Sequence, residues 1–157
     1  MTDTQSVRIE RNFAAPIDQV WTMWADAEHF ASWYGPTGAT IPEARMDTQV
    51  GGSRFVAMKM ETPNGAMQMY FTGEFLEVDE PNRLVYTEAM CDADGNITAP
   101  EDMGMPPGPA TTRIIVELTA IDSGTAMVMT HEGVPADSPG AMGWAMALDK
   151  LDARLAE

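Results

Sequence analysis

The strongest constraint on the fold is a run of alternating apolar and polar segments, joined by tight turns, between residues 38 and 132. Turns at residues 63–65 (Pro-Asn-Gly) and 122–124 (Asp-Ser-Gly) are typical of hairpins. Most connections are too short for a crossover, so the run predicts an antiparallel meander. Pro42 favours an edge or bulged strand. The two-residue period of half-buried strands appears in residues 38–47, 53–61, 66–78, 83–90, 111–120 and 125–132.

Two short helices are predicted ahead of this run. Residues 7–13 alternate as a first strand, and Pro16 then opens a helix whose apolar positions share one face. Asp26 is a good cap for a second helix, which carries Phe30 and Trp33 and ends at the Gly-Pro pair at residues 35–36.

A long helix is predicted for residues 139–156, starting at Ser138-Pro139. Trp144, Leu148 and the leucines at 151 and 155 fall on one face. A helix of this length spans about 27 Å, enough to cover a sheet. An antiparallel sheet with one apolar face needs such a cover, so the pattern predicts an α+β fold with a curved sheet of about seven strands around this helix.

Length and charge narrow the class of protein. The 157 residues suit a single domain, residues 1–157, with a flexible tail at residues 1–6 and a long loop at residues 91–110. A net charge of −15 argues against nucleic acid as a partner. No apolar run is long enough for membrane insertion, and the first residues carry no signal core. The single cysteine, Cys91, favours a reducing cytoplasm.

The inward faces of several strands are rich in methionine, a flexible residue that adapts to varied apolar ligands. They predict either a packed core or a pocket for a hydrophobic ligand. The predicted ligand-binding residues are Trp33, Tyr34, Met58, Met69, Phe71, Met127, Met129, His131, Trp144 and Leu148.

Three polar residues are candidates for acid–base chemistry. His131 follows two inward methionines in register, so it is expected either to act in a pocket or to be bonded to backbone or water at a strand end. Tyr86 and Glu88 share one strand face and would be a proton donor and acceptor if that face is inward. Arg54 and Arg113 are expected on the outer face.

No metal or cofactor is predicted. The histidines and Cys91 do not have the spacing of a zinc site, and Gly51-Gly52 lacks the residues of a phosphate loop. The loop at residues 91–110 is expected to be either a lid, with Met103 and Met105 over a pocket mouth, or a solvent loop.

Several stretches together resemble a known family. They are "NFAAPIDQVWTMWADAEHFASWYGP" (residues 12–36), "PNRLVYTE" (81–88), "GTAMVMTHEG" (124–133) and "GWAMALDKLDARL" (143–155). They are similar to the activator of Hsp90 ATPase homologue-like family of the SRPBCC superfamily, which includes START lipid-transfer domains, the birch-pollen-allergen type and polyketide cyclases. The resemblance implies a helix-grip fold with a deep apolar cavity under the last helix, and it allows a homodimer.

Three functions follow as hypotheses. The first is binding of a hydrophobic or aromatic small molecule, lipid-like or polyketide-like, in that cavity. The second is a polyketide cyclase or hydrolase that uses His131 with Tyr86 or Glu88. The third is a module that regulates the Hsp90 ATPase through an outer surface.

Overall fold

The computed structural model describes residues 6–99, 101, 110–134 and 139–156, and seven strands form one antiparallel sheet among them. The strands are β1 (Ser6–Phe13), β2 (Ala39–Met46), β3 (Ser53–Thr62), β4 (Gly65–Asp79), β5 (Arg83–Cys91), β6 (Thr111–Ile121) and β7 (Gly124–Glu132). Their order across the sheet is β1-β7-β6-β5-β4-β3-β2. Strands β2 to β7 therefore form the predicted meander, and β1 joins it by pairing with β7.

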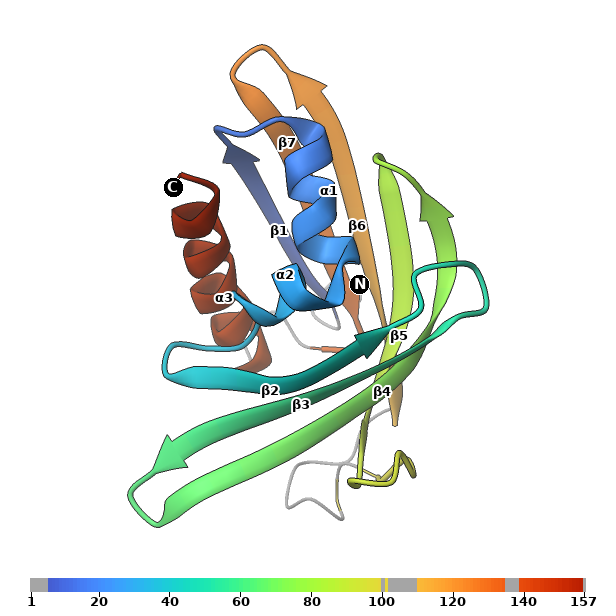
Figure 1. The fold of residues 1–157 in the computed structure, drawn as a ribbon, viewed down its shortest axis with the longest axis vertical. Helices are drawn as coiled ribbons and strands as arrows, with labels where there is room; N and C mark the ends of the chain where they lie inside the picture. The colour runs from blue at the N-terminus through green and yellow to red at the C-terminus, as the bar shows by residue number, and fades with distance from the viewer. Residues whose placement is uncertain (1–5, 100, 102–109, 135–138, 157) are drawn as a thin grey trace.

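Three helices lie within the curve of this sheet: α1 (Ile17–Ala25), α2 (Ala27–Ala31) and α3 (Pro139–Leu155) (Figure 1). The predicted α+β helix-grip architecture, with two short helices after the first strand, is confirmed. The expected cap of the last helix, Ser138, lies outside the described residues. The predicted face of α3 is also confirmed, because Trp144, Leu148, Leu151 and Leu155 are buried in one core cluster.

The second helix is shorter than predicted. It ends at Ala31 rather than at Gly35-Pro36. The chain continues as hydrogen-bonded turns, in which the amides of Trp33 and Tyr34 both donate to the carbonyl of Phe30. Gly35 then takes a positive φ of 93°, which turns the chain away toward β2.

The irregular strands lie near where the sequence places them. β2 is an edge strand, and its register on β3 shifts between Thr40 and Glu43, on either side of Pro42. On β4 the register on β5 shifts between Phe75 and Glu77. Bulges of this kind increase the local twist and help the sheet to curve.

The segment after β5 begins as a folded turn. The carboxylate of Asp92 accepts hydrogen bonds from the backbone amides of Asp94 and Asn96. The amide of Thr98 donates to the Met90 carbonyl at 2.9 Å, so this part returns to the end of β5. The proposed lid residues Met103 and Met105 lie outside the described residues.

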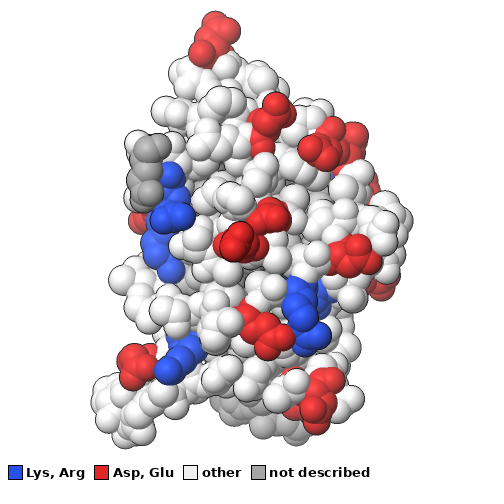
Figure 2. Space-filling model, in the orientation of Figure 1, with Lys and Arg blue, Asp and Glu red and all other residues white. Residues whose placement is uncertain are grey.

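Acidic side chains are scattered over the face shown in Figure 2, with basic side chains among them. Several of the basic groups are paired, as in Arg113, whose Nε lies 2.8 Å from a carboxylate oxygen of Glu132. Arg113 is half-exposed on the outer face, as predicted. None of the helices in the described part of the chain has the length and apolar character needed to cross a membrane.

Candidate ligand-binding site

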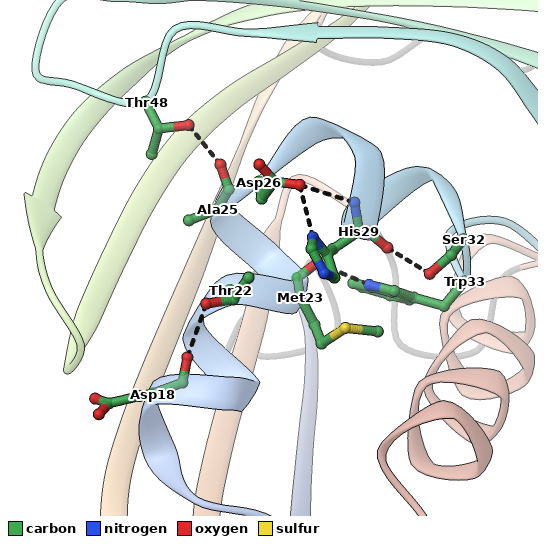
Figure 3. A network of polar contacts seen from close by, with 9 residues as sticks. All are labelled: Asp18, Thr22, Met23, Ala25, Asp26, His29, Ser32, Trp33 and Thr48. Carbon is green, nitrogen blue, oxygen red and sulfur yellow. Dashed lines mark hydrogen bonds and ion pairs between the residues drawn. The ribbon is translucent and has the colours of Figure 1, made fainter. Parts of the chain in front are cut away.

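The two short helices form a corner that is held by the carbonyl groups at the end of α1 (Figure 3). The last carbonyls of a helix have no partner within the helix. Here the Trp33 indole donates to the Met23 carbonyl at 2.8 Å, and the Thr48 hydroxyl donates to the Ala25 carbonyl at 2.6 Å. Asp26 caps α2, as predicted, by accepting from the His29 amide. The corner therefore fixes the Trp33 ring inside the molecule.

Aromatic rings fill the space between this corner and α3. Trp24 stacks on Trp144 of α3, with ring centroids 5.9 Å apart, and meets Trp33 edge-on at 4.8 Å. Tyr34 stacks on Phe30 at 4.5 Å. Such contacts add to the burial of large apolar surfaces. The wall of the interior is thus aromatic on the helix side and methionine-rich on the sheet side.

His131 connects α3 to the sheet. Its Nδ1 accepts a hydrogen bond from the Trp144 indole at 2.9 Å, and its Nε2 lies 2.7 Å from the Thr112 hydroxyl. An indole nitrogen can only donate, so Nδ1 carries no proton and the neutral ring carries its proton on Nε2. The Thr112 hydroxyl in turn donates to the Glu88 carbonyl at 3.1 Å. Burial lowers the pKa of His131, which favours this neutral form.

Arg54 lies inside the molecule, so its predicted place on the outer face is wrong. Its side chain is fully buried, and its guanidinium carbon lies 4.0 Å from the centre of the Tyr86 ring and 5.3 Å from that of Phe30. Nη1 is 3.7 Å from Oε2 of Glu88, which also accepts a hydrogen bond from the Tyr34 hydroxyl at 2.9 Å. The interior therefore contains a buried ion pair.

Gly73 lies on the strand between the two members of this ion pair. It is the register partner of Arg54 on β3, and it lies on β4 between β3 and β5, the strand that carries Glu88. A Cβ atom at position 73 would lie 1.9 Å from the Thr87 carbonyl oxygen, so only glycine fits. Without a side chain between them, Arg54 and Glu88 can approach each other across β4.

The polar side chains in this interior have too few acceptors. Among the described residues, five buried side-chain atoms have no hydrogen-bond partner, and all are donors: Nε1 of Trp24, all three guanidinium nitrogens of Arg54, and the Tyr86 hydroxyl. Leaving a buried donor without a partner costs about 1–3 kcal/mol. Burial raises the pKa of Tyr86 and, together with Glu88, that of Tyr34, so both hydroxyls keep their protons.

The structure brings the predicted site residues into one interior. Met69 and Phe71 lie on β4 and are partly buried against the core cluster. Tyr86 and Glu88 also face inward, which the sequence left open. The remaining predicted ligand-binding residues are buried: Trp33, Tyr34, Met58, Met127, Met129, His131, Trp144 and Leu148.

Sequence reasoning missed Arg54, although a signal was present. Arg54 has the same strand parity as Met58, which the sequence predicts as a ligand-binding residue on an inward face. Arginine is seldom fully buried, so composition argued against this position. Its partner Glu88 lies two strands away in the sheet.

A family model matches this architecture over almost the whole chain. The model is "Activator of Hsp90 ATPase homolog 1-like protein", and it matches residues 14–156. The chain belongs to this family. No protein of curated function matches the sequence.

Solved structures similar to this Hsp90 ATPase activator homologue-like protein come from several bacteria. A protein from Chromobacterium violaceum is 22% identical, with a TM-score of 0.78, and the match covers 98% of this chain and 99% of that one. A protein from Nitrosomonas europaea is 21% identical, with a TM-score of 0.76, and the match covers 99% of this chain and 97% of that one. The AHSA1 protein from Silicibacter pomeroyi is 21% identical, with a TM-score of 0.72, and the match covers 96% of this chain and 97% of that one. At such identities the likeness supports the fold alone.

Proposed function

We propose that this protein binds a hydrophobic or aromatic small molecule, lipid-like or polyketide-like, between the concave face of the sheet and α3. The observation that carries the proposal is a row of inward apolar side chains that runs from solvent into the core. Met67 is 47% exposed and pairs with Met60, which is partly buried. The next inward pair is Met69 with Met58, which is buried.

This apolar row is more exposed than a packed core requires. An exposed methionine such as Met67 costs free energy in water, and such residues are common where a binding surface must adapt to its ligand. Phe71 continues the row toward the interior and pairs with Val56. A ligand with an apolar body would cover these side chains and remove them from water.

The experiment measures binding of Nile red, a neutral apolar dye, by its fluorescence. Wild type is expected to bind the dye. Met69→Glu, which puts a charge on the inward face, is expected to weaken binding about tenfold or more. Gln68→Glu is the matched control, because residue 68 is the exposed neighbour that pairs with Lys59 on the outer face. Absence of dye binding, or equal weakening in both variants, would contradict the proposal.

The second candidate function is the polyketide cyclase or hydrolase. It is favoured by Tyr86 and Glu88, which face the same interior as Arg54 and could donate and accept a proton there. His131 is a weaker base in this arrangement, because both its ring nitrogens have partners. The third hypothesis, regulation of the Hsp90 ATPase, stays a prediction.

A further inference from the structure

Resting on this proposed function, we propose that the bound molecule presents an uncharged carbonyl oxygen to the Arg54 guanidinium and the Tyr86 hydroxyl. The chemical class is an aromatic or aliphatic ketone, ester or amide, rather than a plain hydrocarbon, an amine or a carboxylic acid. The inference goes beyond apolar binding, because it assigns a polar subsite at the buried end of the apolar row.

The buried polar groups without a partner beside Glu88 are hydrogen-bond donors. Arg54 has five N–H donors, and none of its nitrogens has a hydrogen-bond partner among the described residues. The Tyr86 hydroxyl beside it is also unpaired, and burial raises its pKa, so it retains its proton. These groups require an acceptor, and an oxygen atom of a ligand is the simplest one that an otherwise apolar molecule brings.

The carboxylate of Glu88 favours an acceptor without charge. Glu88 already places a carboxylate 3.7 Å from the guanidinium. A ligand carboxylate would bring a second negative charge beside the first in a poorly solvated interior, which is unfavourable. An ammonium group would meet the positive charge of Arg54. A neutral carbonyl oxygen accepts from both donors and leaves the charge balance of the ion pair unchanged.

The polar subsite continues the apolar row at its buried end. Arg54, Val56 and Met58 alternate on the inward face of β3. Two residues of a strand span about 7 Å, which is close to the length of two fused aromatic rings. This is the separation along β3 between Arg54 and Val56, which pairs with Phe71 of the apolar row. One molecule of this size can therefore lie against that pair while its carbonyl oxygen reaches the two donors.

The test compares three probes that share a naphthalene body: 2-acetylnaphthalene, 2-ethylnaphthalene and 2-naphthoate. Their affinities for the purified protein are measured by equilibrium dialysis. Wild type is expected to bind the ketone about tenfold more tightly than the ethyl compound, as hydrogen bonds to a charged donor predict. The naphthoate is expected to bind more weakly than the ketone.

Two variants and one control locate this preference. Tyr86→Phe removes a hydroxyl that has no partner in the described structure, so the fold should be retained, and binding of the ketone should weaken about fivefold. Arg54→Met should remove most of the preference for the ketone. Binding of the ethyl compound should change little in Tyr86→Phe and in Arg54→Met. Tyr70→Phe is the matched control, because Tyr70 stacks on Phe55 of β3, which does not share the inward parity of Arg54.

The outcomes separate the two proposals. Equal affinity of wild type for the ketone and the ethyl compound would overturn the carbonyl subsite and leave apolar binding intact; water would then satisfy Arg54. Tightest binding of the naphthoate would overturn the assignment of a neutral group. If none of the three probes binds while Nile red does, the subsite assignment fails alone. If Nile red does not bind either, the proposed function fails with it.

Discussion

The buried ion pair should be coupled far more strongly than any surface pair of this protein. Removing the charge of Glu88 with Glu88→Gln keeps an oxygen to accept from Tyr34 but leaves Arg54 as an uncompensated buried charge. At the observed separation of 3.7 Å, the Coulomb attraction is about 4.5 kcal/mol for an effective dielectric constant of 20. We therefore expect Glu88→Gln to lower the free energy of unfolding by about 3 kcal/mol.

The double variant should recover much of this loss. Arg54→Met combined with Glu88→Gln removes both charges together with the unpaired guanidinium donors. The free energy of unfolding of this double variant should lie within about 1 kcal/mol of that of wild type, because replacing a whole buried pair is often neutral. Arg54→Met, the fourth corner of the double-mutant cycle, leaves Glu88 unpaired and should itself cost at least about 1 kcal/mol, so the coupling energy should be about 3 kcal/mol or more.

The assay is urea unfolding of the four proteins at neutral pH, followed by tryptophan fluorescence. The control cycle uses Arg113→Met and Glu132→Gln. That pair is closer, with 2.8 Å between Nε and Oε1, but both side chains are about half-exposed. Exposed pairs contribute at most about 1 kcal/mol. A coupling energy for the Arg54–Glu88 pair no larger than that of the control would refute the reasoning.

Two further predictions concern His131 and Gly73. Burial lowers the pKa of His131, so below about pH 6.5 the unfolded chain binds more protons than the folded protein. The free energy of unfolding should therefore fall as the pH drops below about 6.5, by at most about 1.4 kcal/mol per pH unit. Urea titrations at several pH values should show this slope in wild type and in His29→Gln but not in His131→Gln. Gly73→Ala should destabilise the protein by about 2 kcal/mol or more, because its Cβ would overlap the Thr87 carbonyl. Gly143→Ala in α3 should instead stabilise the protein by about 0.5–1 kcal/mol, because its Cβ would meet no atom within 4 Å. Equal thermal midpoints for the two glycine variants would contradict this.

Much of the fold could be predicted because it depends on local periods. A strand exposes alternate residues on opposite faces, so Met127, Met129 and His131 were assigned together to the inward side, and the structure places them there. The site could be predicted less well. The partners of His131 are Thr112 on the neighbouring strand and Trp144 on α3, and no local pattern relates the three residues.

The meander, the two short helices after the first strand and the amphipathic last helix follow from local sequence, because hydrogen bonding and side-chain period within one segment are local. The approach of Arg54 to Glu88, in contrast, arises from tertiary structure. Their approach depends on the register of three strands, on the missing side chain at Gly73 and on the helix corner that covers them with Phe30. Sequence patterns place the charge of Arg54 in water, but it is buried because strand pairing brings Glu88, from a distant segment, close to it. The donors of Arg54 and Tyr86 that remain unpaired are the ones that we assign to a ligand.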